Sequence, residues 1–424
     1  MSKAKKDELI LIIGGGPAGL GAALAFDNNG YKNILVLEGR PDMNFDIENS
    51  YPVGLNVRGQ NAVKSLFGSH TQPEVSKLGL RVDHWKITVG PGINVANFDS
   101  GLVVGTTRAE VTHLLYDESQ RRGTIKVLFG HKAKSVDLPS RTVTCETKTG
   151  ETKDFQAACL IIGDGYRSKV RDLLAEADKS LKIEQWPWNI SFRVLLSDVE
   201  PKTDLDPYTH YIHNQIYISK FLNGRWSAGV SIKDDSPKFL SSTEATDKNV
   251  DELEKYLKKI APPAAQLMTR DELKRFFGRS IFTGAVTKVS KLCIDKWALL
   301  LGDAAHSAIP ATGEGINSAL EDCLILQNSL AKSENNLGDC LLDFEANRLE
   351  DVNALSDLAY SLARPSFKSG LQMVVLGMFK KFTGPSKEDF LFGKNSSTTK
   401  RYSEVIKIWE QQTKLLGGPN VPKA

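Results

Sequence analysis

The 424-residue sequence predicts an α/β fold: a Rossmann-type parallel domain, an interleaved and mostly antiparallel β-sheet domain, and a C-terminal helical cap. Three observations predict it. A glycine-rich turn joins an apolar run to a helical stretch near the N-terminus, the chain alternates like antiparallel strands from Trp186, and its last part has mostly helical patterns. The predicted ranges are 1–75, 102–182 and 281–340 for the Rossmann-type domain, 76–101 and 183–280 for the sheet domain, and 341–424 for the cap.

The N-terminal segment fits a dinucleotide-binding unit. An apolar run at residues 9–13 precedes Gly14, Gly16 and Gly19, and a helical stretch and a second apolar run ending at Glu38 follow. The first glycine permits a tight turn, the second lets a pyrophosphate approach the backbone, and the third lets the helix lie close to the strand. A carboxylate at Glu38 accepts hydrogen bonds from a ribose diol and repels a 2′-phosphate, which favours FAD or NAD here. An ordinary glycine turn is the alternative, but strand, helix and acid all agree.

Composition and charge narrow the class of protein. Apolar residues make up 41% of the chain, charged residues 25%, and the net charge is +3, which predicts a globular protein and gives no reason to expect nucleic acid. The charged N-terminus runs directly into the first predicted strand without the apolar region of a signal peptide, so we expect a protein that is not secreted. We expect it in the cytoplasm or, after removal of a targeting segment, in an organelle lumen or stroma.

The cysteines and histidines do not predict a metal site. The five cysteines are odd in number and form no C-x-x-C pair, which favours reduced thiols in the core. His210 and His213 would point to opposite faces of a strand, so we expect no metal there. The cysteines are Cys145, Cys159, Cys293, Cys323 and Cys340.

The remaining elements follow from periodicity and turn residues. A helix is expected from near Gly59 and another over residues 107–122, with short strands in IKVLFG, RTVTCET and ACLIIGDG. Asn223-Gly224 predicts a hairpin with a type I′ turn, and the helix that follows is expected to break at a Pro-Pro pair. Residues 371–382 are apolar but too short to span a membrane, which favours a helix packed on the core and leaves peripheral membrane contact open.

Two further turns carry aspartates after apolar runs. ACLIIGDGYRSKVR brings Asp164 to the end of a buried strand, and LLLGDAAHSAIPATGEGINSALED is expected to end a strand at Asp303, placed to bond a polyol chain. Gly313 and Gly315 leave backbone N–H groups uncovered at the start of a helix, where the partial positive charge would stabilise an anionic reduced flavin. An Asp-Gly pair alone is a weak signal, because a buried aspartate often only satisfies a loop. The long G-D-A-A-H-x-x-x-P-x-x-G-x-G-x-N pattern is specific.

In these three segments the chain resembles the class A FAD-dependent monooxygenases, the p-hydroxybenzoate hydroxylase-like family. The signatures occur in the family's order, and the resemblance covers most of residues 9–330. It implies a bound FAD and transient binding of NADPH or NADH, in keeping with a single G-x-G-x-x-G. The implied FAD contacts are Gly14, Gly16, Pro17, Ala18, Gly19, Glu38, Gly39, Arg40, Arg108, Asp164, Gly302, Asp303, Gly313, Gly315, Ile316 and Asn317. The loop implied to line the reacting flavin ring contains Pro310, Gly313 and Gly315.

Within this family the chain is most similar to the kynurenine 3-monooxygenase group, in VGLNVRGQNAV, TTRAEV, IIGDGYRSKVRDLL and NSALEDC. Three departures concern the substrate. The group's carboxylate-binding arginine has no counterpart in register, because Arg81 matches another position; its tyrosine falls at Phe98; and its phenylalanine pair is Ala311 and Thr312. A carboxylate without that arginine loses hydrogen bonds worth roughly 1.5–3 kcal/mol each. We therefore expect a substrate other than kynurenine and more room beside the flavin.

The resemblance implies hydroxylation of an aromatic or other electron-rich small molecule. NAD(P)H would reduce FAD, and O2 would add at the flavin C4a to give a hydroperoxide whose distal oxygen passes to the substrate. No side-chain nucleophile is expected. Two alternatives stay open: a reductase, cyclase or halogenase of the same fold, and an FAD-binding module without turnover. Residues 186–191 (WPWNIS) match a halogenase signature only in part, so we interpret them as core or lid tryptophans. The expected partners are the substrate and O2, in a monomer or homodimer.

Overall fold

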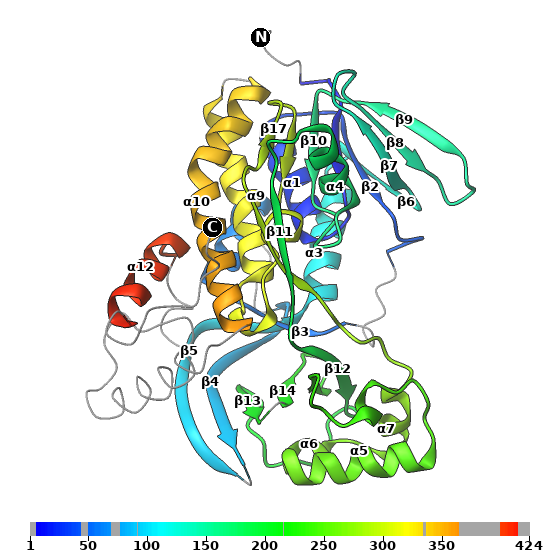
Figure 1. Ribbon diagram of the computed structural model, residues 1–424, viewed down its shortest axis with the longest axis vertical. Coiled ribbons are helices and arrows are strands. Elements are labelled where there is room, and N and C mark those ends of the chain that lie inside the picture. Colours follow the sequence, from blue (N-terminus) through cyan, green and yellow to red (C-terminus); the bar gives the residue numbers. More distant parts are fainter. Residues whose placement is uncertain are drawn as a thin grey trace.

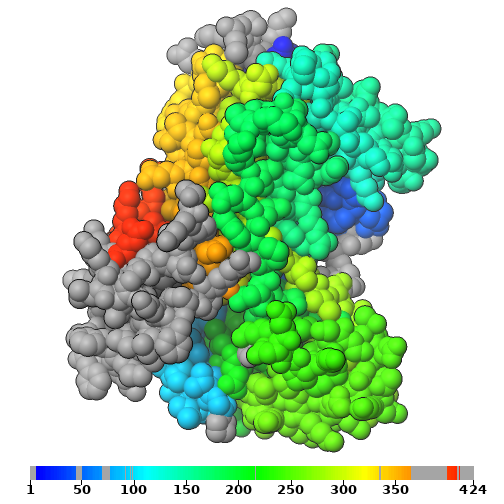
Figure 2. All heavy atoms as spheres, in the orientation of Figure 1, coloured from blue at the N-terminus to red at the C-terminus, as the bar shows by residue number. Residues whose placement is uncertain are grey.

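Two large β-sheets organise the molecule, and the predicted α/β fold is confirmed (Figure 1). The computed structural model describes residues 6–43, 50–68, 77–90, 92–214, 216–333, 336–363 and 399–413. One sheet and its helices form the upper body in Figure 1, and the second sheet with its own helices forms the lower body. Figure 2 shows the same face in space-filling form, with residues of the green chain segment passing from one body to the other.

The upper sheet has six strands in the order β17-β18-β10-β1-β2-β6, and every neighbouring pair except β17–β18 is parallel. Its central strands are buried along their whole length, which explains their continuous apolar sequences. The strands are β1 (Ile10–Ile13), β2 (Ile34–Glu38), β6 (Ile125–Phe129), β10 (Cys159–Ile162), β17 (Cys293–Ile294) and β18 (Ala298–Leu300).

Helices and a small sheet surround the parallel sheet. All five cysteines are buried and unpaired. A three-stranded antiparallel sheet is formed by β7 (Lys132–Asp137), β8 (Thr142–Glu146) and β9 (Thr152–Gln156). The helices of this body are α1 (Pro17–Asn28), α2 (Val57–Phe67), α3 (Arg108–Arg121), α4 (Lys169–Ala177), α8 (Asp303–His306), α9 (Gly315–Lys332) and α10 (Leu337–Ala363), with a short 3₁₀ turn at Pro310–Thr312.

Capping residues fix where two of these helices begin. α2 starts two residues before the predicted Gly59, because the Asn56 side chain accepts hydrogen bonds from the first free backbone N–H groups. α3 starts one residue after Thr107, which forms a complete capping box with Glu110. Both caps lie next to the predicted cofactor turns, so they also fix the direction in which those segments enter the site.

The lower sheet has seven strands in the order β12-β15-β14-β13-β4-β5-β3, and only the β13–β4 pair is parallel. The predicted mostly antiparallel sheet is therefore confirmed. Helices α5 (Asp247–Ile260), α6 (Pro262–Leu267) and α7 (Arg270–Phe276) cover one face, and the predicted break at the proline pair separates the first two. The strands are β3 (Pro52–Leu55), β4 (Leu80–Val89), β5 (Ile93–Thr107), β12 (Ser191–Leu196), β13 (Thr209–His213), β14 (Ile216–Lys220) and β15 (Trp226–Ile232).

The predicted type I′ turn between β14 and β15 is wrong. That turn needs positive φ at both central positions, but only Gly224, at φ 82°, has it, and Asn223 does not. Gly224 N donates to Phe221 O at 3.1 Å, and Phe221 N donates to Arg225 O at 2.8 Å. The loop is thus a type I turn followed by a left-handed glycine. The Asn223 side chain accepts from Arg225 N at 3.1 Å, an interaction that keeps the asparagine out of the left-handed region.

A two-stranded ribbon joins the bodies: β11 (Ile183–Pro187) pairs with β16 (Ala285–Val289). Trp186 therefore belongs to this ribbon, and the strand of the seven-stranded sheet begins at Ser191 and not at Trp186, as the sequence suggested. Trp186 and Trp188 are both half-buried and pack against the same buried cluster, and the Trp186 ring lies 4.9 Å from that of Tyr360 between centroids, which fits tryptophans at the edge of the core.

The C-terminal part contributes α10 and α12 (Tyr402–Thr413), which pack against each other. The apolar segment 371–382 lies outside the described residues. No helix in the described ranges is both long and apolar enough to cross a membrane. The same part of the chain contains no group of three or more His, Cys, Asp or Glu side chains arranged to hold a metal ion.

The division into domains stays a proposal. Strand pairing bears on two of its boundaries, because β3 and the last residues of β5 belong to the seven-stranded sheet although they fall within the ranges 1–75 and 102–182. β3 has only four residues, and a proline and a glycine among them leave no alternation from which this pairing could be predicted.

Candidate functional site

The three predicted turns meet at one edge of the six-stranded sheet. They follow β1, β10 and β18, which are adjacent and parallel, so their carboxyl ends lie side by side. A Cβ placed on Gly14 would lie 2.5 Å from Gly163 O and 2.8 Å from Asp164 Cα. One placed on Gly302 would lie 3.0 Å from Ala18 Cβ in the first turn. The predicted cofactor residues from three distant segments are thus brought together.

The glycine turn is crowded on one side and open on the other. Gly14 has φ +105°, and a Cβ on Gly19 would lie 1.9 Å from Gly14 O, so neither position accommodates a side chain. The nearest atom to a Cβ on Gly16 is Arg108 Nη2, at 3.9 Å. α1 begins at Pro17 with no side-chain cap, which leaves its first N–H groups free for an anion. Open space beside free N–H groups is what a pyrophosphate requires.

Glu38 fixes the glycine turn and keeps acceptor capacity. Its two carboxylate oxygens accept from Gly15 N at 2.7 Å and from Arg40 N at 2.8 Å, and Arg40 Nη2 lies 3.1 Å away. Burial alone would raise the pKa of Glu38, but these hydrogen bonds lower it below its ordinary value, so the group is ionised. Oε2 accepts both from Gly15 N and from Arg40 Nη2, but Oε1 accepts from Arg40 N alone and retains a lone pair that a ribose hydroxyl could use. Gly39, also predicted here, has Lys132 packed against it.

Arg108 lies between the first and third turns, and Tyr51 supports it. The Tyr51 phenol hydrogen-bonds to the Arg108 guanidinium. The phenol raises the pKa of Arg108 most, burial opposes it, and the Asp303 carboxylate adds to the rise. The Arg108 side chain keeps solvent-exposed surface although protein groups surround it, so it can contact a bound anion. Sequence reasoning missed Tyr51, which stands in an irregular stretch with no motif around it.

Asp164 carries the clearest sign of a missing ligand. Its Oδ1 is buried and has no hydrogen-bond partner among the residues that the structure describes. Burial raises the pKa of this carboxyl to about 6, although hydrogen bonds from Ser168 and from the Val170 backbone oppose the rise. A buried acceptor without a donor is costly and rare in proteins. A hydroxyl of a bound nucleotide or ribityl chain would satisfy it.

The third turn is held from behind by Asp322. One carboxylate oxygen accepts from Gly302 N at 2.8 Å and contacts His306 Nε2 at 2.7 Å, and the other accepts from Arg348 Nε at 2.8 Å. Asp303 does not end the strand, as the sequence suggested: β18 stops at Leu300, and Asp303 is the first residue of α8. The short strand ends early because the backbone at Gly302 turns into positive φ.

In the predicted flavin turn, residues 310–317, Gly313 is exposed, Gly315 is half-buried and Asn317 is buried. A Cβ on Gly313 or Gly315 would meet no atom within 4 Å, and α9 begins at Gly315 without a side-chain cap. Pro310 is exposed and Ile316 half-buried. The Asn317 amide is buried and donates to Gly54 O and Gly313 O, both at 2.8 Å. The Asn317 side chain therefore shapes the turn, and open space lies on the glycine side.

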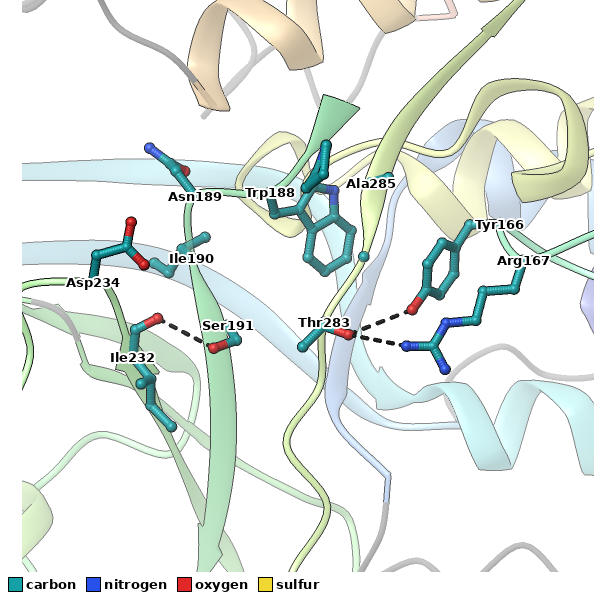
Figure 3. Close-up of a pocket in the computed structure, with 12 residues that line it drawn as sticks. Tyr166, Arg167, Trp188, Asn189, Ile190, Ser191, Ile232, Asp234, Thr283 and Ala285 are labelled. Atoms are coloured by element: carbon teal, nitrogen blue, oxygen red, sulfur yellow. Dashed lines mark hydrogen bonds between the residues drawn. The ribbon is translucent and has the colours of Figure 1, made fainter. Parts of the chain in front are cut away.

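A hollow of about 400 Å³ opens next to the second turn (Figure 3). Tyr166 and Arg167 point toward Thr283, whose Oγ1 lies 3.4 Å from the phenol oxygen and 3.3 Å from Arg167 Nη2. The guanidinium carbon of Arg167 lies 5.1 Å from the Tyr166 ring centroid. On the opposite wall, Trp188 has a buried Nε1 with no partner among the described residues. Asp234 is the carboxylate in the lining. The hollow thus combines an arginine, aromatic surfaces and one carboxylate.

Comparison with known proteins places these features in context. A family model described as FAD binding domain matches residues 84–359. A kynurenine 3-monooxygenase from Yarrowia lipolytica is 23% identical over 375 residues, which cover 82% of this chain and 79% of the relative. One from Legionella pneumophila is 25% identical over 362 residues, covering 82% and 78%.

Two solved structures share the fold. A variant of 2-methyl-3-hydroxypyridine-5-carboxylic acid oxygenase aligns with a TM-score of 0.68 and 19% identity over 87% of this chain and 96% of that chain. A variant of Klebsiella pneumoniae HpxO complexed with FAD aligns with a TM-score of 0.69 and 16% identity over 92% and 98%. At these identities the likeness concerns the fold alone.

Proposed function

We propose a function from one premise: the chain belongs to the FAD-dependent monooxygenases, the aromatic hydroxylase family whose model is described as FAD binding domain. On that premise we propose that it uses a nicotinamide nucleotide and O2 to hydroxylate an aromatic small molecule whose buried part carries no charge. The observation that carries the proposal is the meeting of three turns around open space, with one buried carboxylate oxygen left unsatisfied.

The residues present fit FAD. The open side of Gly16 and the free N–H groups of α1 would take the pyrophosphate, Glu38 the ribose, and Asp164 or Asp303 the hydroxyl-bearing chain. The glycine side of residues 310–317 would accept the ring system. FAD supplies the redox chemistry: it accepts reducing equivalents and activates O2 for transfer of one oxygen atom. The protein's part is to bind and orient the reactants and to exclude water.

The hollow beside Tyr166 and Arg167 supports a site for the electron donor. NADH and NADPH carry a pyrophosphate that an arginine binds well and flat rings that stack on aromatic side chains. The hollow borders the second turn, so a donor bound there would lie next to the FAD site. Thr283 is hydrogen-bonded to Arg167 and would help to hold the guanidinium in place.

The seven-stranded sheet supports the proposal for the substrate. One of its faces is covered by α5–α7, and the opposite face carries Phe192, whose ring packs 5.6 Å from that of Tyr51, the partner of Arg108. The opposite face therefore looks toward the FAD turns at this end. Side chains alternate between the two faces along each strand. Among the described residues of β12 to β15, no lysine or arginine falls on the face opposite α5–α7.

The polar groups that β12 to β15 place on that face are neutral. Tyr217 O–H lies 2.6 Å from His210 Nδ1, and burial lowers the pKa of His210 to about 3. The imidazole is therefore uncharged at neutral pH and shares one hydrogen bond with the Tyr217 hydroxyl. Kynurenine would bring an ammonium and a carboxylate to this surface, and neither finds an opposite charge there. A neutral hydroxy- or amino-substituted aromatic ring fits better.

The test measures oxygen insertion directly. Purified protein is given NADH or NADPH and matched pairs of hydroxy- and amino-aromatics with and without a carboxylate, under isotopically labelled O2. We expect labelled product and faster nucleotide oxidation with the neutral member of a pair. Tyr217→Phe should raise the KM for that substrate, and the exposed Tyr208→Phe serves as the control. Labelled product from the carboxylated members alone would contradict the substrate proposal, and hydrogen peroxide as the sole product across the panel would contradict hydroxylation.

A further inference from the structure

The flavin turn contains a buried carboxylate that the proposed reaction does not use. Glu314 stands between Gly313 and Gly315, and its side chain is directed into the protein and is 10% exposed. Its Oε1 accepts from Asn56 Nδ2 at 3.0 Å, and its Oε2 accepts from Tyr402 O–H at 2.7 Å. Arg58 Nε lies 3.9 Å from Oε2. Each oxygen thus has one close donor, and one of the two donors comes from the C-terminal helix.

Tyr402 is the first residue of α12 and lies 88 positions from Glu314 in the sequence. It is 1% exposed, and the Arg58 guanidinium carbon lies 4.2 Å from its ring centroid. The next residue anchors the same helix, because Ser403 N donates to Asp351 Oδ1 at 3.0 Å. Arg58 also donates to the Lys400 carbonyl. Several independent contacts therefore hold the start of α12 against α2, α10 and the flavin turn.

The Tyr402 hydroxyl has no other partner in the described part of the chain that would explain its burial. Burying a carboxylate is unfavourable unless donors replace the lost water. Without the hydroxyl, Glu314 Oε2 would keep only Arg58, at a distance beyond a normal hydrogen bond. The carboxylate would then have to move or rotate. The backbone of Glu314 lies between Gly313 and Gly315, beside open space, so it could move with the side chain. A change at Tyr402 thus reaches the surface proposed to receive the flavin.

We infer that Tyr402 is a positioning residue of the flavin turn: through its hydrogen bond to the Glu314 carboxylate, the C-terminal helix fixes the conformation of residues 313–317. The expected effect on flavin binding rests on the proposed function. The expected effect on the conformation of the turn rests on the contacts alone. The C-terminal helix then supports the cofactor site through the Glu314 carboxylate.

The test uses four full-length proteins: wild type, Tyr402→Phe, Glu314→Gln and the double variant. The matched control is Ser403→Ala, which keeps the backbone hydrogen bond to Asp351 and the aromatic ring next to it. The first measurement is hydrogen exchange of the backbone amides of residues 313–317, which does not depend on turnover. The second is FAD affinity, and the third is the midpoint potential of bound flavin.

Tyr402→Phe should speed exchange of these amides and weaken FAD binding, each by roughly tenfold, as expected for loss of one hydrogen bond to a charged group. In the Glu314→Gln background the same change should have less than about a third of that effect, because coupled residues are not additive. Glu314→Gln should make the potential less negative, because it removes the negative charge held behind the turn, whereas Tyr402→Phe removes no charge. Ser403→Ala should change none of the three.

The inference would be overturned if Tyr402→Phe had the same effect in the wild-type and in the Glu314→Gln background, or if amide exchange at residues 313–317 were unchanged. Tyr402 would then have only a packing role. If Tyr402→Phe does not fold, Glu314→Gln decides: by reciprocity it should speed exchange at residues 402 and 403, and unchanged exchange there refutes the coupling. A wild-type protein that binds no FAD would refute the proposed function, while the exchange data would still decide the coupling.

Discussion

Replacing Asp164 by asparagine should change stability and cofactor binding in opposite directions. Burial raises the pKa of this carboxyl to about 6 from an ordinary value of 3.8. The corresponding penalty for the ionised form is about 3 kcal/mol as an upper value. Asparagine keeps an acceptor for Ser168 and the Val170 N–H but carries no charge. We therefore expect Asp164→Asn to raise the free energy of unfolding of the flavin-free protein by about 1–3 kcal/mol at neutral pH.

The sign of the pH dependence follows from the same shift. Between pH values of about 4 and about 6 the native Asp164 binds a proton that the unfolded chain has released. Stability therefore falls as pH rises through this window, and the Asp164→Asn variant should lack that fall. FAD affinity should drop by about tenfold in the variant, because a hydrogen bond to a neutral group replaces one to a carboxylate.

Urea unfolding of the flavin-free proteins from about pH 4 to about pH 8, a range that spans the window in which the pKa shift acts, measures the effect on stability. FAD titration at about pH 7.5 measures the effect on cofactor affinity. Asp178→Asn is the opposite control, because hydrogen bonds from Lys291 and Ser180 lower the pKa of Asp178 to about 2. That change should lower stability by up to about 1 kcal/mol and leave FAD affinity unchanged. The reasoning is refuted if Asp164→Asn destabilises the flavin-free protein at neutral pH while FAD affinity stays the same.

Three further predictions concern the turns and the hollow. Asp322→Asn should lower the free energy of unfolding by about 3 kcal/mol in urea, because Arg348 loses a buried charge partner; an unchanged midpoint would contradict this. Gly123→Ala should lower the free energy of unfolding by about 1 kcal/mol, because only the positive φ opposes a side chain there. Gly14→Ala should lower it by at least about 2 kcal/mol more, because the added Cβ would also meet backbone atoms. Equal melting temperatures of the two variants would refute this difference. Arg167→Ala should raise the KM for the nicotinamide nucleotide by about tenfold with FAD affinity unchanged, and steady-state kinetics with an unaltered KM would exclude the hollow as the donor site.

The fold class and the meeting of the three turns could be predicted because both follow from local sequence patterns. Strand, glycine turn, helix and acid follow one another within residues 9–38, and parallel strands bring their carboxyl ends to one edge. The hairpin between β14 and β15 could also be located, but its turn type depends on one extra residue. The Asn223 side chain hydrogen-bonds to the backbone and moves the left-handed position to Gly224.

The groups behind the site could not be predicted from the sequence. Asp322 stands on α9 like any polar helix residue, and only the packing of α10 brings Arg348 to it. Tyr402 meets Glu314 across 88 positions with no motif at either end. Tyr51 follows an irregular stretch, and its contact with Arg108 depends on how that stretch returns to the sheet. Such contacts are set by tertiary packing, and a single sequence carries no local signal for them.

Calorimetric titration of the flavin-free full-length protein with FAD tests the central claim most directly, in the wild type and in variants of each turn. The account predicts one FAD per chain and weaker binding in Gly16→Val, Asp164→Asn and Asp303→Asn alike, because all three turns would contact the same molecule. A protein that takes up no FAD, or one whose affinity responds to a single turn and ignores the other two, would contradict it.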